Sequence, residues 1–591
     1  MSTFWGASNK IPVKQTSTAI SSVNGLSYSP GQVVHIDIPP SVKFIQPKES
    51  WLQFDFKISN PVNGSDGTTR LQLDGQIGAQ SLIRDIRVYS STENGGVLLE
   101  EIQGYNSMVS VKYDYDTDDN LKNKRAVAGE GSTTHKPETR GTLGTQKSMV
   151  ADIKTNPYFV SSETGTHQTA FTNSSFTTAK MCIPLHTGIW GSNKVFPNLL
   201  TGCRIEIILE SADRCLRQLD SVLRGNKVLL NPRFDSVNGS QSGGKTGLAQ
   251  GSTLTSFYIT NENNNLTPEQ CPFVVGELVG FCDANGCQTT SSVFTAVDGI
   301  SCPRITRINA SASASNNAGL VQITCDPALD LASATTIVPE GFFVYSESVD
   351  TVDNGTFAPS YLVSNVEMVV QELDMGSQYE NSMRKSMSEG GNIAYDILTA
   401  TNYRYSQLSS DIVANIRLPL NESRAKSIIC VPTDATNYTA QQRIFPNITY
   451  DVSASLTGDG TSLSTRSGFV GISDNVQSYQ FYYGSPAKLQ PSRLVSTAKI
   501  SSKNSIDAQP IIENEKALVQ AGISARSFSC YNSNYILSRA LSLNNGVYDA
   551  RNKDFNLQVN YGLASKNKLW NNFVFSLRRI NIRGDSINIV V

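Results

Sequence analysis

Ser478-Tyr-Gln-Phe-Tyr-Tyr-Gly484 and Asp554-Phe-Asn-Leu-Gln-Val-Asn-Tyr561 are the stretches of this sequence that decide its fold. In both, apolar or aromatic residues alternate with polar ones, the period of two that a strand with one buried face requires. Each run stops at a glycine. The alternation returns in residues 572–582 and 587–591. The segment from Val476 to Val591 therefore predicts short strands separated by turns, with one helical interruption.

Taken in order, these phrases resemble a known family. Four segments, taken together, resemble the second half of a double jelly-roll major capsid protein, as found in virophages and polinton-like viruses. They are Tyr479-Gln-Phe-Tyr-Tyr-Gly484, Leu489-Gln-Pro-Ser-Arg493, a short helix around Glu513 to Ala521, and Phe573 to Val591. An earlier phrase resembles the matching segment of the family's first jelly roll: Met181-Cys-Ile-Pro-Leu-His-Thr-Gly-Ile-Trp190, with Lys194, Pro197 and the strand Cys203 to Glu210.

The resemblance implies an all-β fold of two consecutive jelly-roll β-sandwiches, with a small β-rich insertion in the first and few short helices. It implies a major capsid protein whose homotrimers form pseudo-hexagonal capsomers that tile an icosahedral virion shell. The expected partners are neighbouring capsomers, a penton protein and minor capsid proteins. The expected location is the virion capsid, assembled inside the infected host cell.

Composition fits a turn-rich β protein. The chain has 591 residues, enough for two to four domains, with 39% hydrophobic and only 17% charged residues. Its formal charge of -2 gives no basic field for holding phosphates, so no specific nucleic-acid binding is predicted. The first ten residues hold no apolar run, and nowhere do 18 apolar residues follow one another, so neither a signal peptide nor a membrane span is predicted.

The predicted division has four parts. Residues 1–30 are polar and uneven and predict an N-terminal arm, for which order and disorder both stay open. Residues 31–375 predict the first roll, including an inserted β subdomain at about 256–350. Residues 376–391 are a polar connector, and 392–591 predict the second roll. In the first roll, Leu98 to Lys112 is the best helix candidate, and Asp114 to about Thr177 predicts a surface loop.

One motif imitates nucleotide-binding chemistry. Gly239-Ser-Gln-Ser-Gly-Gly-Lys-Thr246 matches the phosphate-cradling pattern G-x-x-x-x-G-K-[ST]. That chemistry needs a buried strand before the loop and a helix that starts at the lysine. The residues before it form a poor strand, and glycines follow it at 247 and 251. A surface loop is the better interpretation.

Metal sites are weakly indicated. Cys271, Cys282, Cys287 and Cys302 could surround zinc, but their spacing lacks the two tight pairs of a zinc ribbon. The ten cysteines are expected to be mostly buried thiols, although disulfides or metal at 271 to 325 stay open. An acidic run could bind calcium but lacks the loop's glycine and closing glutamate, so a solvated face is favoured; it comprises Asp114, Asp116, Asp118 and Asp119.

No catalytic pattern accompanies the histidines, which are His35, His135, His167 and His186. A lone histidine such as His186 is predicted to be a packed side chain. No catalytic, cofactor-binding or metal-binding residue is assigned, no cofactor is expected, and the protein is predicted not to be an enzyme. The alternative is a β-rich carbohydrate-binding or glycan-hydrolysing protein, which would need two carboxylates in a cleft; a phage fibre or adhesin is a weaker third hypothesis.

Overall fold

The computed structural model describes most of both predicted rolls and part of the predicted insertion. The described residues are 14–59, 71–73, 77–91, 96–116, 125, 128–130, 159–161, 168–170, 179–218, 228–229, 253–259, 278–282, 295–296, 304–310, 321–330, 343–347, 360–435, 469, 471, 476–483, 495–496, 508–525, 535–541, 546–561, 567–583 and 586–590.

The first half of the chain forms a sandwich of two antiparallel four-stranded layers. Its eight strands, in chain order, are β1 (Lys14–Ser21), β3 (Val33–Ile38), β5 (Trp51–Ser59), β7 (Ile83–Tyr89), β8 (Leu98–Gln103), β11 (Ala179–Ile183), β12 (Cys203–Leu209) and β21 (Ser360–Asp374). One layer has the order β1-β21-β5-β11 and the other β3-β12-β7-β8. If these eight strands are counted from one to eight along the chain, one layer has the order one, eight, three, six and the other has the order two, seven, four, five. This is the Greek-key order of a jelly roll.

The second half repeats this order. Its eight strands are β22 (Asn392–Gln407), β23 (Val413–Leu418), β24 (Ala425–Asp434), β25 (Val476–Tyr483), β26 (Val495–Ser496), β27 (Leu537–Ala540), β28 (Phe555–Tyr561) and β29 (Lys568–Arg583). The layers are β22-β29-β24-β27 and β23-β28-β25-β26, again one, eight, three, six and two, seven, four, five. The predicted double jelly roll is therefore confirmed by the strand order of each half.

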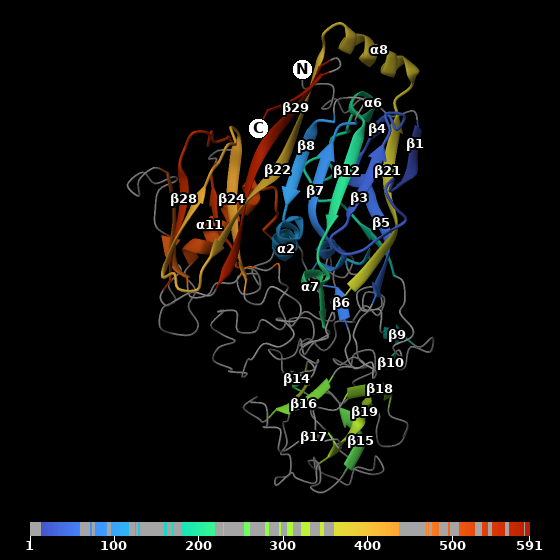
Figure 1. Ribbon diagram of the computed structural model, residues 1–591, viewed down its shortest axis with the longest axis vertical. Helices are drawn as coiled ribbons and strands as arrows, with labels where there is room; N and C mark the ends of the chain where they lie inside the picture. Colours follow the sequence, from blue (N-terminus) through green and yellow to red (C-terminus); the bar gives the residue numbers. More distant parts are fainter. Residues whose placement is uncertain are drawn as a thin grey trace.

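Smaller elements complete the two rolls. Short strands β2 (Ser27–Tyr28) and β4 (Phe44–Ile45) pair with β21, β6 (Leu71–Leu73) pairs with β13 (Leu216–Gln218), and β30 (Ser586–Val590) pairs with β29. The helices with described bounds are η1 (Pro47–Glu49), η2 (Gly78–Leu82), α2 (Tyr105–Asp116), α6 (Asn198–Thr201), α7 (Ala212–Cys215), α8 (Ser377–Ser388) and α11 (Ala508–Gln520). Figure 1 shows the rolls side by side, with α8 joining them at one end.

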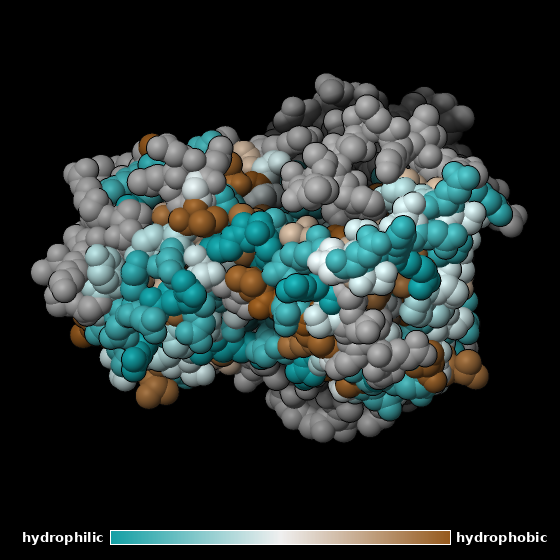
Figure 2. Space-filling model, turned by 90° about the horizontal axis from the view of Figure 1, so that it is seen from above, coloured by the Kyte–Doolittle hydropathy of each residue, from teal (hydrophilic) through white to brown (hydrophobic). Residues whose placement is uncertain are grey.

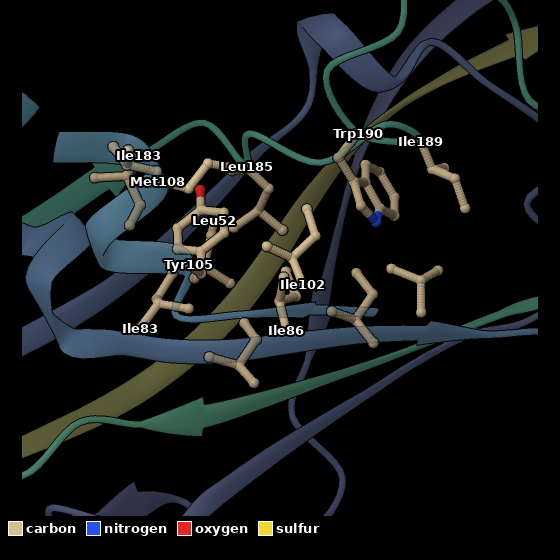
Figure 3. Packing of buried hydrophobic residues seen from close by; sticks show 14 of the residues in the cluster. Leu52, Ile83, Ile86, Ile102, Tyr105, Met108, Ile183, Leu185, Ile189 and Trp190 are labelled. Carbon is tan, nitrogen blue, oxygen red and sulfur yellow. The ribbon is translucent and has the colours of Figure 1, made fainter. Parts of the chain in front are cut away.

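Alternation along the strands builds the cores. In β5, Leu52, Phe54 and Phe56 are buried, while Trp51 and Gln53 on the other face are only partly buried. Figure 3 shows Leu52 in one group with Ile83, Ile86 and Ile102 of the opposite layer and with Tyr105 and Met108 of α2. Burial of large aliphatic side chains contributes about 1.5–3 kcal/mol each, so this stripe supplies much of the free energy that holds the layers together.

A further sheet lies apart from the rolls. Its strands are β9 (Phe159–Ser161), β10 (Gln168–Ala170), β14 (Val228–Leu229), β15 (Thr253–Ile259), β16 (Leu278–Cys282), β17 (Thr295–Ala296), β18 (Arg304–Ala310), β19 (Val321–Asp330) and β20 (Phe343–Glu347). It lies beyond the end of the first roll opposite α8 (Figure 1). The sequence placed an inserted β subdomain at about 256–350, whereas β9, β10, β14 and the start of β15 come from before it.

Residues 14–30 differ from the predicted arm. β1 pairs with β21 along its whole length, from Lys14 opposite Asp374 to Ser21 opposite Glu367, and β2 also pairs with β21. β1 is an edge strand whose side chains are exposed or only half-buried, so it needs little apolar sequence to pair. Its polar composition therefore looked like that of an arm.

Two further local predictions were wrong. Residues 98–103 form β8, because pairing with β7 buries Leu99 and Ile102 and outweighs the helical spacing; only the helix from Tyr105 onward remains. Gly104, with φ +67°, makes the turn between strand and helix. Asp114 and Asp116 belong to α2 instead of a loop. The predicted connector 376–391 contains α8, whose Met383 and Met387 are buried.

Candidate functional site: the contact between the two rolls

The sheet of β22, β29, β24 and β27 is buried on both faces. In its strands, the side chains on one face pack inside the second roll, and the side chains on the other face pack into the core that includes the first roll. The first set comprises Ile428, Cys430, Trp570 and Val574, and the second Ile429, Val431, Phe573 and Phe575. A sheet exposed on one face would alternate apolar and polar residues, so the near-continuous burial of β29 indicates a covered outer face.

Glu100 of β8 is the polar centre of the contact. Its side chain has no exposed surface. Oε1 accepts hydrogen bonds from the Gly188 amide and the Thr399 hydroxyl, both at 2.6 Å, and Oε2 accepts one from the Ile189 amide at 3.0 Å. Thr399 belongs to β22 of the second roll. A buried carboxylate is tolerated only with such partners, so Glu100 binds a strand of one roll to a loop of the other.

A second set of polar contacts involves residues of β22 that follow Thr399 along the strand. The Asn402 side-chain amide donates to the Gln103 carbonyl oxygen at 3.0 Å, and Arg404 Nη2 donates to Asp85 Oδ1 at 3.3 Å. The same Asp85 oxygen accepts from the Gly104 amide at 2.8 Å. A Cβ atom at Gly104 would lie 2.8 Å from Asn402 Nδ2, so a larger residue here would displace the side chain that links the rolls.

Aromatic and cationic groups close the end of the contact near α8. Tyr395 of β22 is buried, and its ring meets that of Phe196 edge-on, with 5.5 Å between the ring centroids. Its hydroxyl donates to the Lys194 carbonyl oxygen at 3.0 Å, while Lys194 Nζ donates to the Asp396 carbonyl oxygen at 2.9 Å. Burial raises the pKa of Tyr395 to about 12. The loop between β11 and β12 is thereby fixed on β22.

Asp396 holds a pair of arginines on the second roll. Both carboxylate oxygens accept from Arg579, at 2.8 and 2.9 Å, and Oδ1 also accepts from Arg424 Nη1 at 3.1 Å. Hydrogen bonding to Arg579, followed by that to Arg424, lowers the pKa of Asp396 to about 2. The paired arginine donors fix the backbone segment whose carbonyl receives Lys194.

The most catalysis-like set of side chains lies inside the first roll. The Tyr113 hydroxyl contacts Glu130 and also lies 2.8 Å from His186 Nε2, and Gln80 Nε2 donates to Glu130 at 2.8 Å. The Tyr105 hydroxyl donates to Gln80 Oε1 at 3.0 Å and accepts from the His186 amide. These bonds join η2, α2 and the loop after β11, so the cluster ties structural elements together.

Burial dominates the protonation equilibria of this cluster. It raises the pKa of Glu130 above its ordinary value, against the hydrogen bonds from Tyr113 and Gln80. It lowers the pKa of His186 to about 3, with the nearby charges of Lys112 and Arg125 acting in the same direction. His186 is therefore neutral at pH 7 and packed edge-on against Tyr113, as the sequence predicted for a lone histidine.

Most of the other predicted site residues are not described by the structure. The 239–246 loop, Cys271, Cys287, Cys302, Asp118, Asp119, His135 and His167 lie outside the described residues, and only the backbone of Cys282 is described. Asp116 pairs with Lys112 and Arg125, and His35 accepts from Arg204 on an outer sheet face. Cys203 and Cys430 are buried, as expected, and burial raises the pKa of both thiols.

Within the described ranges, no three His, Cys, Asp or Glu side chains lie close enough to hold a metal ion. In the same part of the chain, no helix has the length and apolar character to cross a bilayer.

Comparison with known proteins gives structural matches only. No protein-family model and no curated protein matches the sequence. Among solved structures, the chain is similar to PBCV-1 VP54 fitted into a reconstruction of the virophage Sputnik (10% identity, 99% of this chain and 98% of that one, TM-score 0.43) and to the Faustovirus major capsid protein (8%, 98% and 91%, 0.42). It is also similar to a chain of the Sputnik virophage (9%, 98% and 89%, 0.37). The strand orders described above establish the two jelly rolls independently of these scores.

Proposed function

We propose that this chain is the major capsid protein of an icosahedral virion. The observation that carries the proposal is the duplicated roll: one polypeptide contains the same eight-strand order twice, and the two copies share a continuous buried core. An enzyme or a lectin needs one cleft on one scaffold, whereas two rigidly joined sandwiches form a building block with two similar sides.

Three such chains would form a pseudo-hexagonal capsomer. Each chain supplies two rolls side by side, so a threefold ring holds six, and six equal corners tile a flat facet. The strands of both rolls run along the long axis of the molecule (Figure 1), which suits an upright orientation in a shell. The sheet beyond the first roll would then form the outward projection, and the end with α8 would form the base.

Neighbouring capsomers, a penton protein and minor capsid proteins are the proposed partners, in a virion assembled inside the host cell. Seen from the end that carries α8, the described surface is mostly hydrophilic, with apolar residues in separate small patches (Figure 2). Such a surface suits weak contacts between capsomers, because many weak contacts sum to a stable shell.

The domain division follows from the same proposal. We assign residues 14–375 to the first roll with its insertion, since β1 is its first strand, and 392–591 to the second. Residues 376–391 connect them. Residues 1–13, the rest of the predicted arm, lie outside the described residues.

The test is the assembly state of the purified protein. Size-exclusion chromatography with light scattering should give about three times the chain mass of 64.2 kDa, and negative-stain images should show compact particles with a threefold outline. A monomer at micromolar concentration that binds a glycan array would contradict the proposal and favour the carbohydrate-binding alternative.

A further inference from the structure

The contact between the rolls is head-to-tail. From the first roll it uses strand five, β8, together with the connection between strands six and seven, which carries Gly188, Lys194 and Phe196. From the second roll it uses strands one and eight: β22 provides Thr399 and Asn402, and Arg578 of β29 donates to the Leu99 carbonyl oxygen at 3.2 Å. Different surfaces of the same fold therefore meet.

Because the contact joins two different surfaces of the same fold, each roll keeps one of these surfaces that takes no part in the contact within the chain. The equivalents of β22 and β29 in the first roll are β1 and β21, and the equivalent connection in the second roll is the segment between β27 and β28. β1 and β28 lie at opposite flanks of the pair of rolls (Figure 1). Contacts of this type close into a ring when the rotation between units permits.

The unused sheet face has a suitable surface. On the outer side of the sheet, Ala19 lies beside Val369, and Val369 lies beside Trp51, which makes an apolar row across three strands. Ala19 is exposed and Trp51 is partly exposed. Ser17 and Gln371 border the row through mutual hydrogen bonds of 2.7 and 3.0 Å. Val369, in the middle of the row, is 7% exposed, and the row is flanked by these hydrogen-bonded polar groups.

The unused connection is well fixed and ends in an exposed apolar side chain. Val547 is 46% exposed. The next residue, Tyr548, exchanges two backbone hydrogen bonds of 2.9 Å with Ala425, and its ring lies 4.0 Å from Lys553 Nζ. Asp549 and Arg551 form an ion pair beside it. The backbone that presents Val547 is therefore ordered by the roll itself.

We propose that the outer face of β1 and β21 in one copy of this chain binds residues 546–554 of a second copy. The contact repeats, between copies, the docking of the β11–β12 connection on β22 within one copy. It rests on the proposed capsid function, since it names the surfaces by which the trimer closes.

The test compares two variants with a matched control. Ala19→Arg and Val547→Asp place a charge in each half of the contact, and each should weaken trimer formation roughly tenfold or more, measured by mass photometry across a dilution series. Val413→Asp charges a similarly exposed valine on β23, in the other layer of the second roll from β22 and β29, and should leave the trimer intact. Circular dichroism confirms that each variant is folded.

Cross-linking of the unmodified protein gives an independent readout. Lys14 is the first residue of β1 and Lys553 precedes β28 by two residues, and these two strands lie at opposite flanks of the pair of rolls (Figure 1). A lysine-reactive reagent should therefore join the two lysines only between copies, in the trimer and not in the monomer. If the native protein is a trimer that lacks this cross-link, and if both variants remain trimers, the inference is overturned while the capsid function stands. A native protein that never forms trimers would instead overturn the proposed function.

Discussion

Gly188 lies directly against the backbone of Leu398, in the other roll. A Cβ atom at Gly188 would stand 2.7 Å from the Leu398 carbonyl oxygen and 2.8 Å from Glu100 Oε1. Backbone cannot move away as a flexible side chain can, so glycine is required at this position by the approach of the two sandwiches. At this point of the contact, the approach of the rolls therefore depends on one residue of a loop and one residue of a strand.

Replacing this glycine should loosen the contact. Gly188→Val inserts two methyl groups as well as the Cβ, and overpacking of this kind costs about 1–3 kcal/mol. We expect a clear fall in the thermal unfolding midpoint by calorimetry. Asn193→Val, at an exposed position of the same loop, should leave the midpoint nearly unchanged. Equal midpoints for both variants would contradict the assigned approach.

The acceptor role of Glu100 can be tested by a change of one atom. Glu100→Gln replaces one acceptor oxygen by a donor that faces an amide or hydroxyl donor, so about 2–3 kcal/mol of unfolding free energy should be lost. Glu101→Gln is the control, because Glu101 forms a partly exposed pair with Arg87 that is worth about 1 kcal/mol or less. Chemical denaturation measures both.

A double-mutant cycle then isolates the contact between the rolls. Thr399→Val removes the hydroxyl that donates to Glu100. The cost of Thr399→Val should be smaller in the Glu100→Gln background than in the native protein, since the two side chains share one bond. Strictly additive costs would show that the bond does not link the rolls.

The strands with one buried face could be predicted from the sequence. In β28, Phe555, Leu557 and Val559 are buried and alternate with half-buried amides, so the period of two was visible. The alternation cannot be recognised in strands whose sequence is not patterned by one buried face alone. β1 is held by backbone pairing at an edge and needs few apolar side chains, and in β8 the apolar residues happened to fit a helical spacing as well.

The contact between the rolls was not predictable in the same way. Glu100 and Thr399 are 299 positions apart, and nothing in the local sequence of either marks its partner. One signal was present: Glu100 stands between Leu99 and Ile102 in a strand, where an acidic residue needs donors if it is buried. The buried cluster around Glu130 was missed because its members come from four separate segments.

Acid should weaken the Asp396 group in a defined window. Its pKa is about 2 in the folded protein against an ordinary value of 3.8, so the unfolded chain binds the proton more tightly. The stabilisation is therefore complete above about pH 4 and is lost as the pH falls toward 2. Asp396→Asn should lower the unfolding midpoint at pH 7, and its difference from the native protein should shrink as the pH approaches 2.

His186 should make stability depend on pH in a higher range. Burial lowers its pKa from 6.5 to about 3, so between these pH values the unfolded chain binds a proton that the folded chain does not bind. Stability from this group is complete above about pH 6.5 and falls as the pH decreases toward 3, with the same sign as for Asp396 but an earlier onset. The charged groups around it differ in effect, since Lys112 and Arg125 oppose protonation and Asp116 favours it.

His186→Gln cannot titrate, so its unfolding midpoint should fall less steeply between pH 6.5 and 4.5 than that of the native protein. A native slope in His186→Gln would show that His186 is not excluded from water.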